Sequence, residues 1–84
     1  MAINTKTVTT NGDWTKVEDL LGISLTDNTK YSIQVVGSSK ISYSSSSTIT
    51  GYFLRDDPKP FTYEKKSGED FYINANNVLL TVAE

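Results

Sequence analysis

Apolar and polar residues alternate with a period of two over much of this chain. The alternation is uninterrupted in residues 31–35, and in residues 78–82 every second residue is apolar, so that Val78, Leu80 and Val82 share one face. Because successive side chains of a strand point to opposite faces, each stretch predicts a strand with one apolar face directed into a core. The residues expected on these two buried faces are Tyr31, Ile33, Val35, Val78, Leu80 and Val82.

Two aromatic stretches flank a charged segment that contains Gly68. In the first stretch, Phe61 and Tyr63 would share one face, and in the second stretch Phe71 and Ile73 would do the same. Aromatic and β-branched runs separated by a polar segment with a glycine predict an antiparallel hairpin. We expect this hairpin to be the surface on which the other apolar runs pack.

Two more strands are predicted between these elements. Residues 40–43 continue the alternation after a turn at residues 37–39, so they are expected to form a hairpin with residues 31–35. Residues 48–54 predict the next strand. Gly51 lies inside that strand and indicates a bulge or a close approach of another part of the backbone.

The first ten residues are mostly polar. Ile3 and Val8 are their sizeable apolar side chains. This pattern predicts either an N-terminal arm or an edge strand in residues 1–10, held only weakly by its own chain.

A short helix is predicted after this arm. Trp14 is followed by apolar residues at helical spacing, which indicates at most one short helical turn near residues 14–21. Asp13 is the expected N-cap and Gly22 the expected residue beyond the C-terminal end. Trp14 could serve as a platform for ligand stacking, but a plug at one end of the core is favoured.

Several short strands, separated by turn signals and with almost no helix, predict an all-β fold. We expect a small antiparallel β-sandwich or jelly-roll-like domain of about six to eight strands. No linker, composition break or internal repeat divides the chain, so a single domain over residues 1–84 is expected. A domain of this size buries only about 60–65% of the surface exposed by its unfolded chain, and association between copies is one way to bury more.

The composition excludes several kinds of site. The sequence contains no cysteine and no histidine. Metal sites with thiolate or imidazole ligands and catalysis by a histidine base are therefore excluded. The adjacent acids Asp56 and Asp57, or Glu69 and Asp70, could be read as calcium ligands, although solvated turn residues are the favoured interpretation. We therefore expect no catalytic residue, metal site or cofactor, and no enzyme activity.

The charges are scattered along the chain. Lys and Arg number 8 and Asp and Glu number 10, for a net charge of −2. A nucleic-acid-binding protein usually has a basic stripe, so no nucleic-acid partner is expected. No stretch has the pattern of a membrane span or an export signal, so we expect no membrane partner and synthesis in the cytoplasm.

Two tyrosines are candidates for an exposed outer face. Tyr52 and Tyr72 fall on the opposite face from Phe53, Phe71 and Ile73. Exposed aromatic rings serve both protein interfaces and glycan stacking. The expected interface residues between copies of the chain are therefore Ile3, Val8, Tyr52 and Tyr72.

The succession of Trp14, the segments 31–37, 60–63 and 68–73, and a final 80–84 resembles small β-sandwich virion structural proteins of tailed bacteriophages, of the head-fibre or capsid-decoration type. The resemblance implies a non-enzymatic virion component, made in the host cytoplasm, that forms a homo-oligomer and contacts other virion proteins.

The analogy with fibre-like phage proteins suggests a trimer. This chain is shorter than fibre proteins that carry a distal domain, which leaves decoration, head-fibre and tail roles open. The alternative function is a small carbohydrate- or ligand-binding β-module. A planar row of aromatic rings in a groove would favour a sugar ligand, whereas a self-complementary apolar patch would favour an oligomer.

Overall fold

A computed structural model describes residues 3–84 of the protein. Met1 and Ala2, which belong to the expected N-terminal arm, lie outside the described residues. Within residues 3–84 the chain forms eight strands and one short helix. In chain order these elements are β1 (Ile3–Val8), β2 (Thr15–Lys16), α1 (Val17–Leu21), β3 (Lys30–Val36), β4 (Ser39–Ser44), β5 (Phe53–Arg55), β6 (Phe61–Glu64), β7 (Asp70–Ala75) and β8 (Val78–Ala83).

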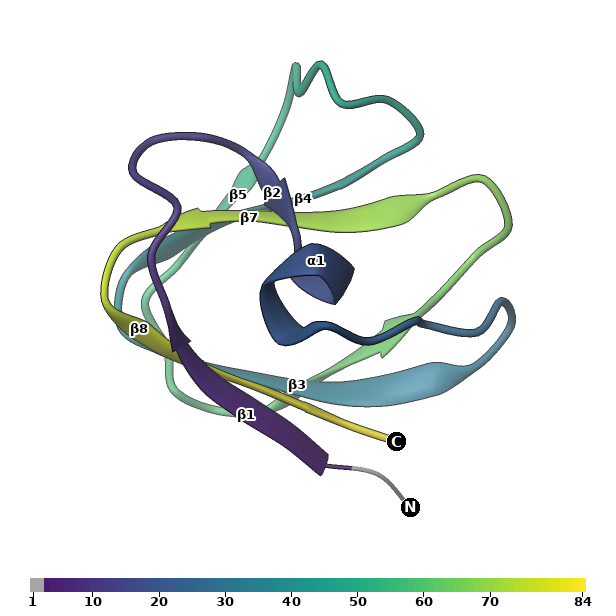
Figure 1. Ribbon diagram of the computed structural model, residues 1–84, viewed down its shortest axis with the longest axis horizontal. Coiled ribbons are helices and arrows are strands. Elements are labelled where there is room, and N and C mark those ends of the chain that lie inside the picture. The colour runs from purple at the N-terminus through teal and green to yellow at the C-terminus, as the bar shows by residue number, and fades with distance from the viewer. Residues whose placement is uncertain (1–2) are drawn as a thin grey trace.

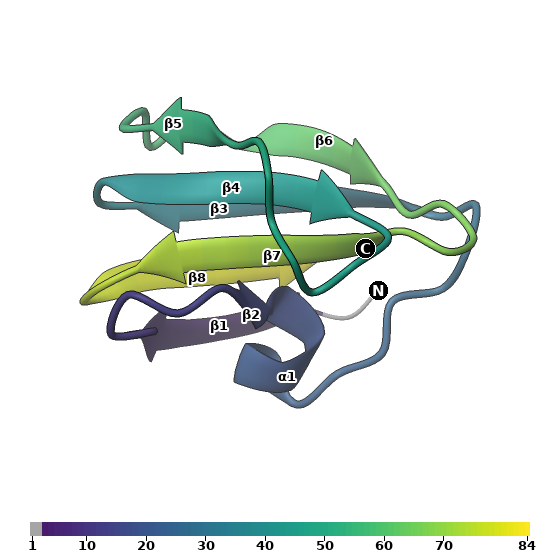
Figure 2. The same ribbon diagram turned by 90° about the horizontal axis from the view of Figure 1, so that it is seen from above.

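The strands form two antiparallel sheets that pack face to face. Over the described residues, the first sheet has the order β1-β8-β3-β6 and the second the order β2-β7-β4-β5. Figure 1 shows the two sheets as separate layers, and Figure 2 shows the second sheet lying over the first. The prediction of an all-β antiparallel sandwich is confirmed.

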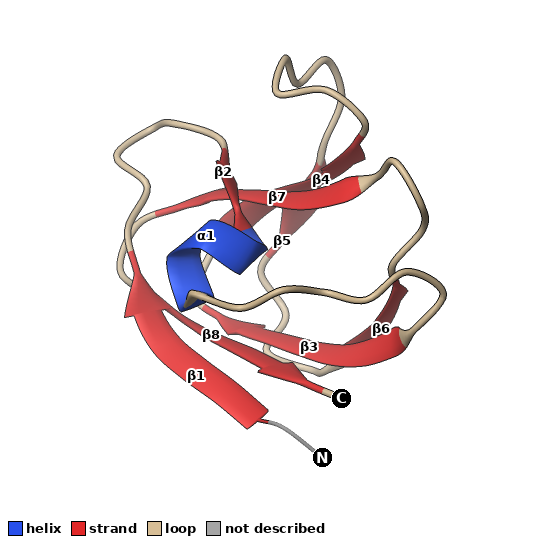
Figure 3. Cartoon of the chain, turned by 45° about the vertical axis from the view of Figure 1, so that its right-hand side comes forward, coloured by secondary structure: helices blue, strands red, loops and turns tan. Residues whose placement is uncertain are grey.

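The strand order also defines how the chain is wound. β1 pairs with β8 and β3 with β6 in the first sheet, while β2 pairs with β7 and β4 with β5 in the second. The chain is therefore a two-stranded ribbon, β1 to β4 against β8 to β5, that passes repeatedly from one sheet to the other (Figure 3). This winding is the jelly-roll arrangement.

Both predicted hairpins are wrong. β6 pairs with β3 in the first sheet, whereas β7 pairs with β2 and β4 in the second. β3 and β4 likewise belong to different sheets. Alternation identifies the apolar face of a strand but not its neighbour, because a turn can lead into the same sheet or into the facing one. The rings of Tyr63 and Phe71 nevertheless meet across the core, with centroids 5.1 Å apart.

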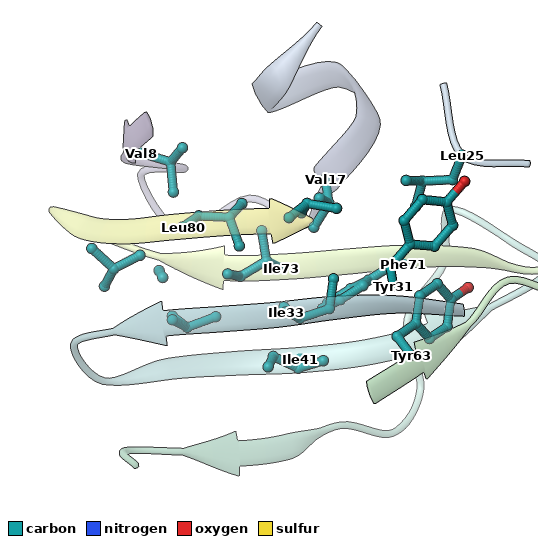
Figure 4. Close-up of a cluster of buried hydrophobic side chains, with 14 residues drawn as sticks. Val8, Val17, Leu25, Tyr31, Ile33, Ile41, Tyr63, Phe71, Ile73 and Leu80 are labelled. Atoms are coloured by element: carbon teal, nitrogen blue, oxygen red, sulfur yellow. The ribbon is translucent and has the colours of Figure 1, made fainter. Parts of the chain in front are cut away.

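The core fills the space between the two sheets (Figure 4). All residues predicted on buried strand faces in β3, β7 and β8 are buried, so those face assignments are confirmed. Val8 from β1 and Val17 from α1 complete the core at one side of the sandwich. The core cluster consists of Val8, Val17, Leu25, Tyr31, Ile33, Val35, Ile41, Tyr63, Phe71, Ile73, Ala75, Val78, Leu80 and Val82.

α1 lies beside β1 and β2, where it covers the end of the sandwich between the two sheets (Figures 1 and 2). Gly22 ends the helix in the left-handed conformation, as predicted. The predicted N-cap is wrong, because Lys16 occupies that position and the pairing of Thr15 with Ile73 holds the preceding residues as strand. Trp14 is half-buried outside the core cluster, so it is not a core plug.

Hydrogen bonds hold the bends of the ribbon. At the first bend, the Thr10 hydroxyl donates to the Ala75 carbonyl at 3.2 Å, in a buried position. At the second bend, the Asn28 N–H donates to the Lys65 carbonyl at 2.7 Å, and the Lys65 N–H donates to the Thr29 carbonyl at 3.0 Å. The two halves of the ribbon therefore stay connected where no strand pairing joins them.

Gly37 makes the close approach that the sequence predicted for Gly51. It joins β3 to β4 with φ +126°, and a Cβ at this position would lie 2.7 Å from Cγ1 of Val78. Gly51 lies in the loop before β5, and a Cβ there would meet no heavy atom within 4 Å. The strand predicted over residues 48–54 is limited to residues 53–55, so Gly51 is not a strand bulge.

We predict that Ile33→Asp abolishes folding. Ile33 is fully buried in the middle of β3, and an unpaired carboxylate at such a site costs several kcal/mol. That loss is comparable to the whole stability of about 4–12 kcal/mol expected for a chain of this length. The control is Ser32→Asp, whose side chain is exposed on the other face of the same strand. Thermal melting by circular dichroism should show a native transition for Ser32→Asp alone, and a native transition in Ile33→Asp would contradict the core assignment.

A second prediction concerns the crossing at Gly37. Gly37→Ala should lower the free energy of unfolding by about 1–3 kcal/mol, through a strained backbone and a clash with Val78. Gly51→Ala is the matched control and should change it by no more than about 0.5 kcal/mol. Urea unfolding measures both variants. Equal stability of the two would show that the approach to Val78 does not constrain the fold.

Candidate interaction surface

The two interface candidates in β1 have different environments. β1 is an edge strand of the first sheet, as one of the two predictions for the first ten residues stated. Ile3 is exposed. Val8 is buried in the core of its own chain, where it lies opposite Val78 in the register with β8. Val8 therefore cannot present the surface expected of an interface residue, and the expectation that it packs across subunits is wrong.

Tyr72 lies on the outer face of β7, as predicted, but it is only 4% exposed. The loop between β4 and β5 stands over this face of the second sheet (Figures 1 and 2). The Ser42 hydroxyl, beside Tyr72 in the register of β4 and β7, donates to the Gly51 carbonyl at 2.7 Å. This hydrogen bond ties the loop to the sheet. The expectation that Tyr72 is exposed is wrong, since sequence periodicity carries no information about such a loop.

Tyr52 is exposed and belongs to a continuous apolar patch. Tyr52, Phe53 and Leu54 are 53%, 63% and 76% exposed, respectively. We name these three residues the β5 patch. Phe53 lies opposite Ile41 on the inner side of the sheet, so Tyr52 and Leu54 point to the outer side. Both sides of this edge strand are therefore apolar and open to solvent.

An apolar groove adjoins the β5 patch between the edge strands β5 and β6. Its cavity volume is about 390 Å³, within the range of small-ligand pockets. The guanidinium of Arg55 lies 4.2 Å from the centroid of the Phe61 ring and donates to the Lys59 carbonyl. The Arg55 Nε is buried and has no hydrogen-bond partner among the described residues. The groove is lined by Ile41, Tyr43, Phe53, Leu54, Arg55 and Phe61.

The floor of this groove is uncharged at neutral pH. Tyr43 stacks on Tyr63 with ring centroids 4.8 Å apart and an interplanar angle of 11°. Burial raises the pKa of the Tyr43 hydroxyl above its ordinary value. Burial also raises the pKa of Tyr63, and the nearby Glu69, which accepts a hydrogen bond from Tyr63 at 3.3 Å, raises it further. Both phenols therefore stay neutral, and Arg55 is the charged group in the lining of the groove.

Trp14 is an aromatic neighbour of Tyr52. The rings of Trp14 and Tyr52 have centroids 5.7 Å apart and are tilted by 48°. The Lys40 ammonium lies over the Tyr52 ring, 5.3 Å from its centroid. A sugar stacks best on a flat, open aromatic surface. The tilt of the rings and the position of Lys40 make this pair a poor platform of that kind.

The acidic pairs considered as calcium ligands are engaged within the chain. Among residues 3–84, no group of three or more Asp, Glu, His or Cys side chains is arranged to hold a metal ion. Each carboxylate of the two pairs instead has a polar partner. The contacts are Ser38 Oγ to Asp56 Oδ1 (2.9 Å), Lys59 N to Asp57 Oδ1 (2.9 Å), Tyr63 Oη to Glu69 Oε1 (3.3 Å) and Lys16 Nζ to Asp70 Oδ2 (3.4 Å).

Comparison of the chain with protein-family models, with curated proteins and with solved structures gave no match. Within the part of the chain that the structure describes, no helix has the length and apolar character needed to cross a membrane.

Sequence reasoning missed Phe53 and Leu54 as surface residues. The available signal was the run Tyr52-Phe53-Leu54, which is apolar at consecutive positions and so has no polar face. Asp56, Asp57 and Pro58 follow shortly afterwards. Charges and prolines beside a short apolar strand are typical of a sheet edge.

The absence of a calcium site stays a prediction with a direct test. Calcium up to about 1 mM, the range of weak extracellular-type sites, should leave the melting temperature unchanged. The double variant Asp56→Asn/Asp57→Asn should respond to calcium in the same way as the parent chain. A melting temperature that rises steeply with calcium in the parent, but not in the variant, would contradict the prediction.

Proposed function

We propose that this protein is a non-enzymatic structural component that acts through contacts between copies of its own chain. The observation that carries the proposal is the β5 patch, which is apolar on both sides of an edge strand and continuous with an apolar groove. Large apolar surfaces that stay exposed in a small domain are typical of interaction sites. Association would bury surface that a domain of this size cannot cover alone.

The biological setting of the proposal is a phage virion, as a capsid decoration, head-fibre or tail part in contact with other virion proteins. It is supported by the motif order described above and by the jelly-roll winding, which also occurs in viral capsid domains. The same winding occurs in lectins, so this support is an analogy at the level of the fold. The number of subunits, for which three was expected, stays a prediction.

The second candidate function is a small carbohydrate-binding module. One observation favours it, namely that Trp14 and Tyr52 lie side by side on the outer face of the second sheet. The tilt between their rings and the ammonium of Lys40 over Tyr52 make self-association the better-supported proposal.

Light scattering over roughly 10–500 µM protein tests the proposed function. We expect a mass above that of one chain and a melting temperature that rises with protein concentration, because association stabilises the folded state by mass action. A chain that stays monomeric at the highest concentration, with a constant melting temperature, would contradict the proposal.

A fluorescence titration examines the second candidate in the same samples. Trp14 is the one tryptophan of the sequence, so its emission reports on ligands that bind beside Tyr52. Saturable changes on addition of neutral mono- and disaccharides, in a monomeric chain, would favour the carbohydrate module. We expect no saturable change.

A further inference from the structure

We propose that two copies of the chain associate through their β5 edges, antiparallel and about a two-fold axis at Leu54. The second sheets of the two copies would then join into one continuous sheet. This inference deepens the proposed function, and it rests on that function for the premise that copies of the chain associate.

The first argument is the open backbone of β5. On one side β5 pairs with β4, from Ser39 opposite Arg55 to Ile41 opposite Phe53. On its other side no strand pairs with it among the described residues. The free N–H and C=O groups of an edge strand form a template for another strand. At the opposite edge of the second sheet, β2 has two residues and leads directly into α1.

The second argument is the area of the exposed patch. With the exposed fractions given above, and taking about 150–250 Å² for a side chain of this size, the β5 patch presents roughly 290–480 Å². A standard interface buries about 800 Å² on each partner. The patch supplies about half of that area, and the adjoining groove and the 56–60 loop lie where they can supply the rest.

The third argument is that the surface is complementary to itself. Phe53 is 63% exposed and projects on the inner side of β5, the same side as the apolar groove of about 390 Å³ that it helps to line. A two-fold contact brings the same patch of both copies together, so it requires a projection and a hollow on one surface. The β5 patch and its groove provide both.

The charges beside β5 permit the contact between two copies, and a proline limits the number of residues that can pair. The segment after Leu54 carries Arg55 and Lys59 against Asp56 and Asp57, so it has no net charge that would repel a second copy. Pro58 has no N–H and therefore cannot extend the ladder. The pairing is confined to a few residues. A two-fold contact also closes at two copies, which differs from the trimer expected from the resemblance.

The outer face of the first sheet is the main rival surface. Its outward-facing positions carry charged side chains at one end, where Lys30 of β3 lies opposite Glu64 of β6, and are uncharged elsewhere in the described strands. Its exposed apolar side chains are separated, however, with Ile3 at one end and Leu79 beside Val36 at the other. The uncharged outward-facing residues are Ile3, Thr5, Thr7, Ser32, Gln34, Val36, Thr62, Leu79, Thr81 and Ala83.

Disulfide trapping distinguishes the β5 edge from the outer face of the first sheet. The chain contains no cysteine, so each variant carries a single thiol. Leu54→Cys should form a cross-linked dimer under mild oxidation. Residues that face each other across an antiparallel pair have Cα atoms about 4.5–5.5 Å apart, within the range that a disulfide spans. Leu79→Cys is the matched control, an exposed leucine on the rival face, and should remain largely uncross-linked on a non-reducing gel.

A second pair of variants tests the same contact without oxidation. Leu54→Asp should weaken association at least tenfold in light scattering, whereas Leu79→Asp should leave the oligomer mass unchanged. Both side chains are exposed, so both variants should keep the parental circular dichroism spectrum. Retention of the parental mass by Leu54→Asp would overturn the inference.

The remaining outcomes separate the inference from the proposed function. If the parent chain oligomerises but Leu79→Cys cross-links faster than Leu54→Cys, or at the same rate, the β5 contact is overturned and the proposed function stands. If the parent is monomeric and neither variant cross-links, both are overturned.

Discussion

The pairing of the chain with itself along one ribbon is the constraint on which the structure depends. The strands β1 to β4 run against β8 to β5, and both sheets follow from where this ribbon bends. The second bend includes a buried cation, Lys65, whose ammonium donates to the carboxylate of Asp27 at 3.3 Å and to the carbonyl of Lys66 at 2.9 Å. A buried lysine is tolerated because these acceptors replace water. Without such contacts, the bends would leave polar backbone groups unpaired.

Much of this fold could be predicted from the sequence. The buried residues of β3, β7 and β8 were assigned to the correct faces. Successive side chains of a strand point to opposite faces, so the local pattern of apolar residues is enough to identify the buried face. Strand partners were not assigned correctly, because Gly37 and the segment between Phe61 and Phe71 read as ordinary turns. Whether such a turn stays in one sheet or crosses to the other depends on distant contacts, such as that between Gly37 and Val78.

For the interaction surface, too, local patterns predicted part of the structure and contacts between distant residues determined the rest. Tyr52 was correctly expected on the surface, whereas the burial of Tyr72 depends on a loop held by the Ser42 hydroxyl, which no local pattern reveals. Phe53 points toward the facing sheet and should by its direction be buried. It is exposed because β5 is the last strand of its sheet, and the position of a strand within a sheet is a property of the whole topology.

The pairing of β1 with β8 has a consequence for synthesis. Val8 lies opposite Val78, and Ile3 lies opposite Ala83, so the first described strand gains its partner only after residues 78–83 have been made. Pairings between residues so far apart in sequence form slowly, because closing the long loop costs conformational entropy before the contacts between the strands contribute favourable free energy. On the ribosome, the N-terminal strands would therefore remain open to chaperones and to neighbouring nascent chains. Folding of this domain can accordingly be completed only after β8 has been synthesised.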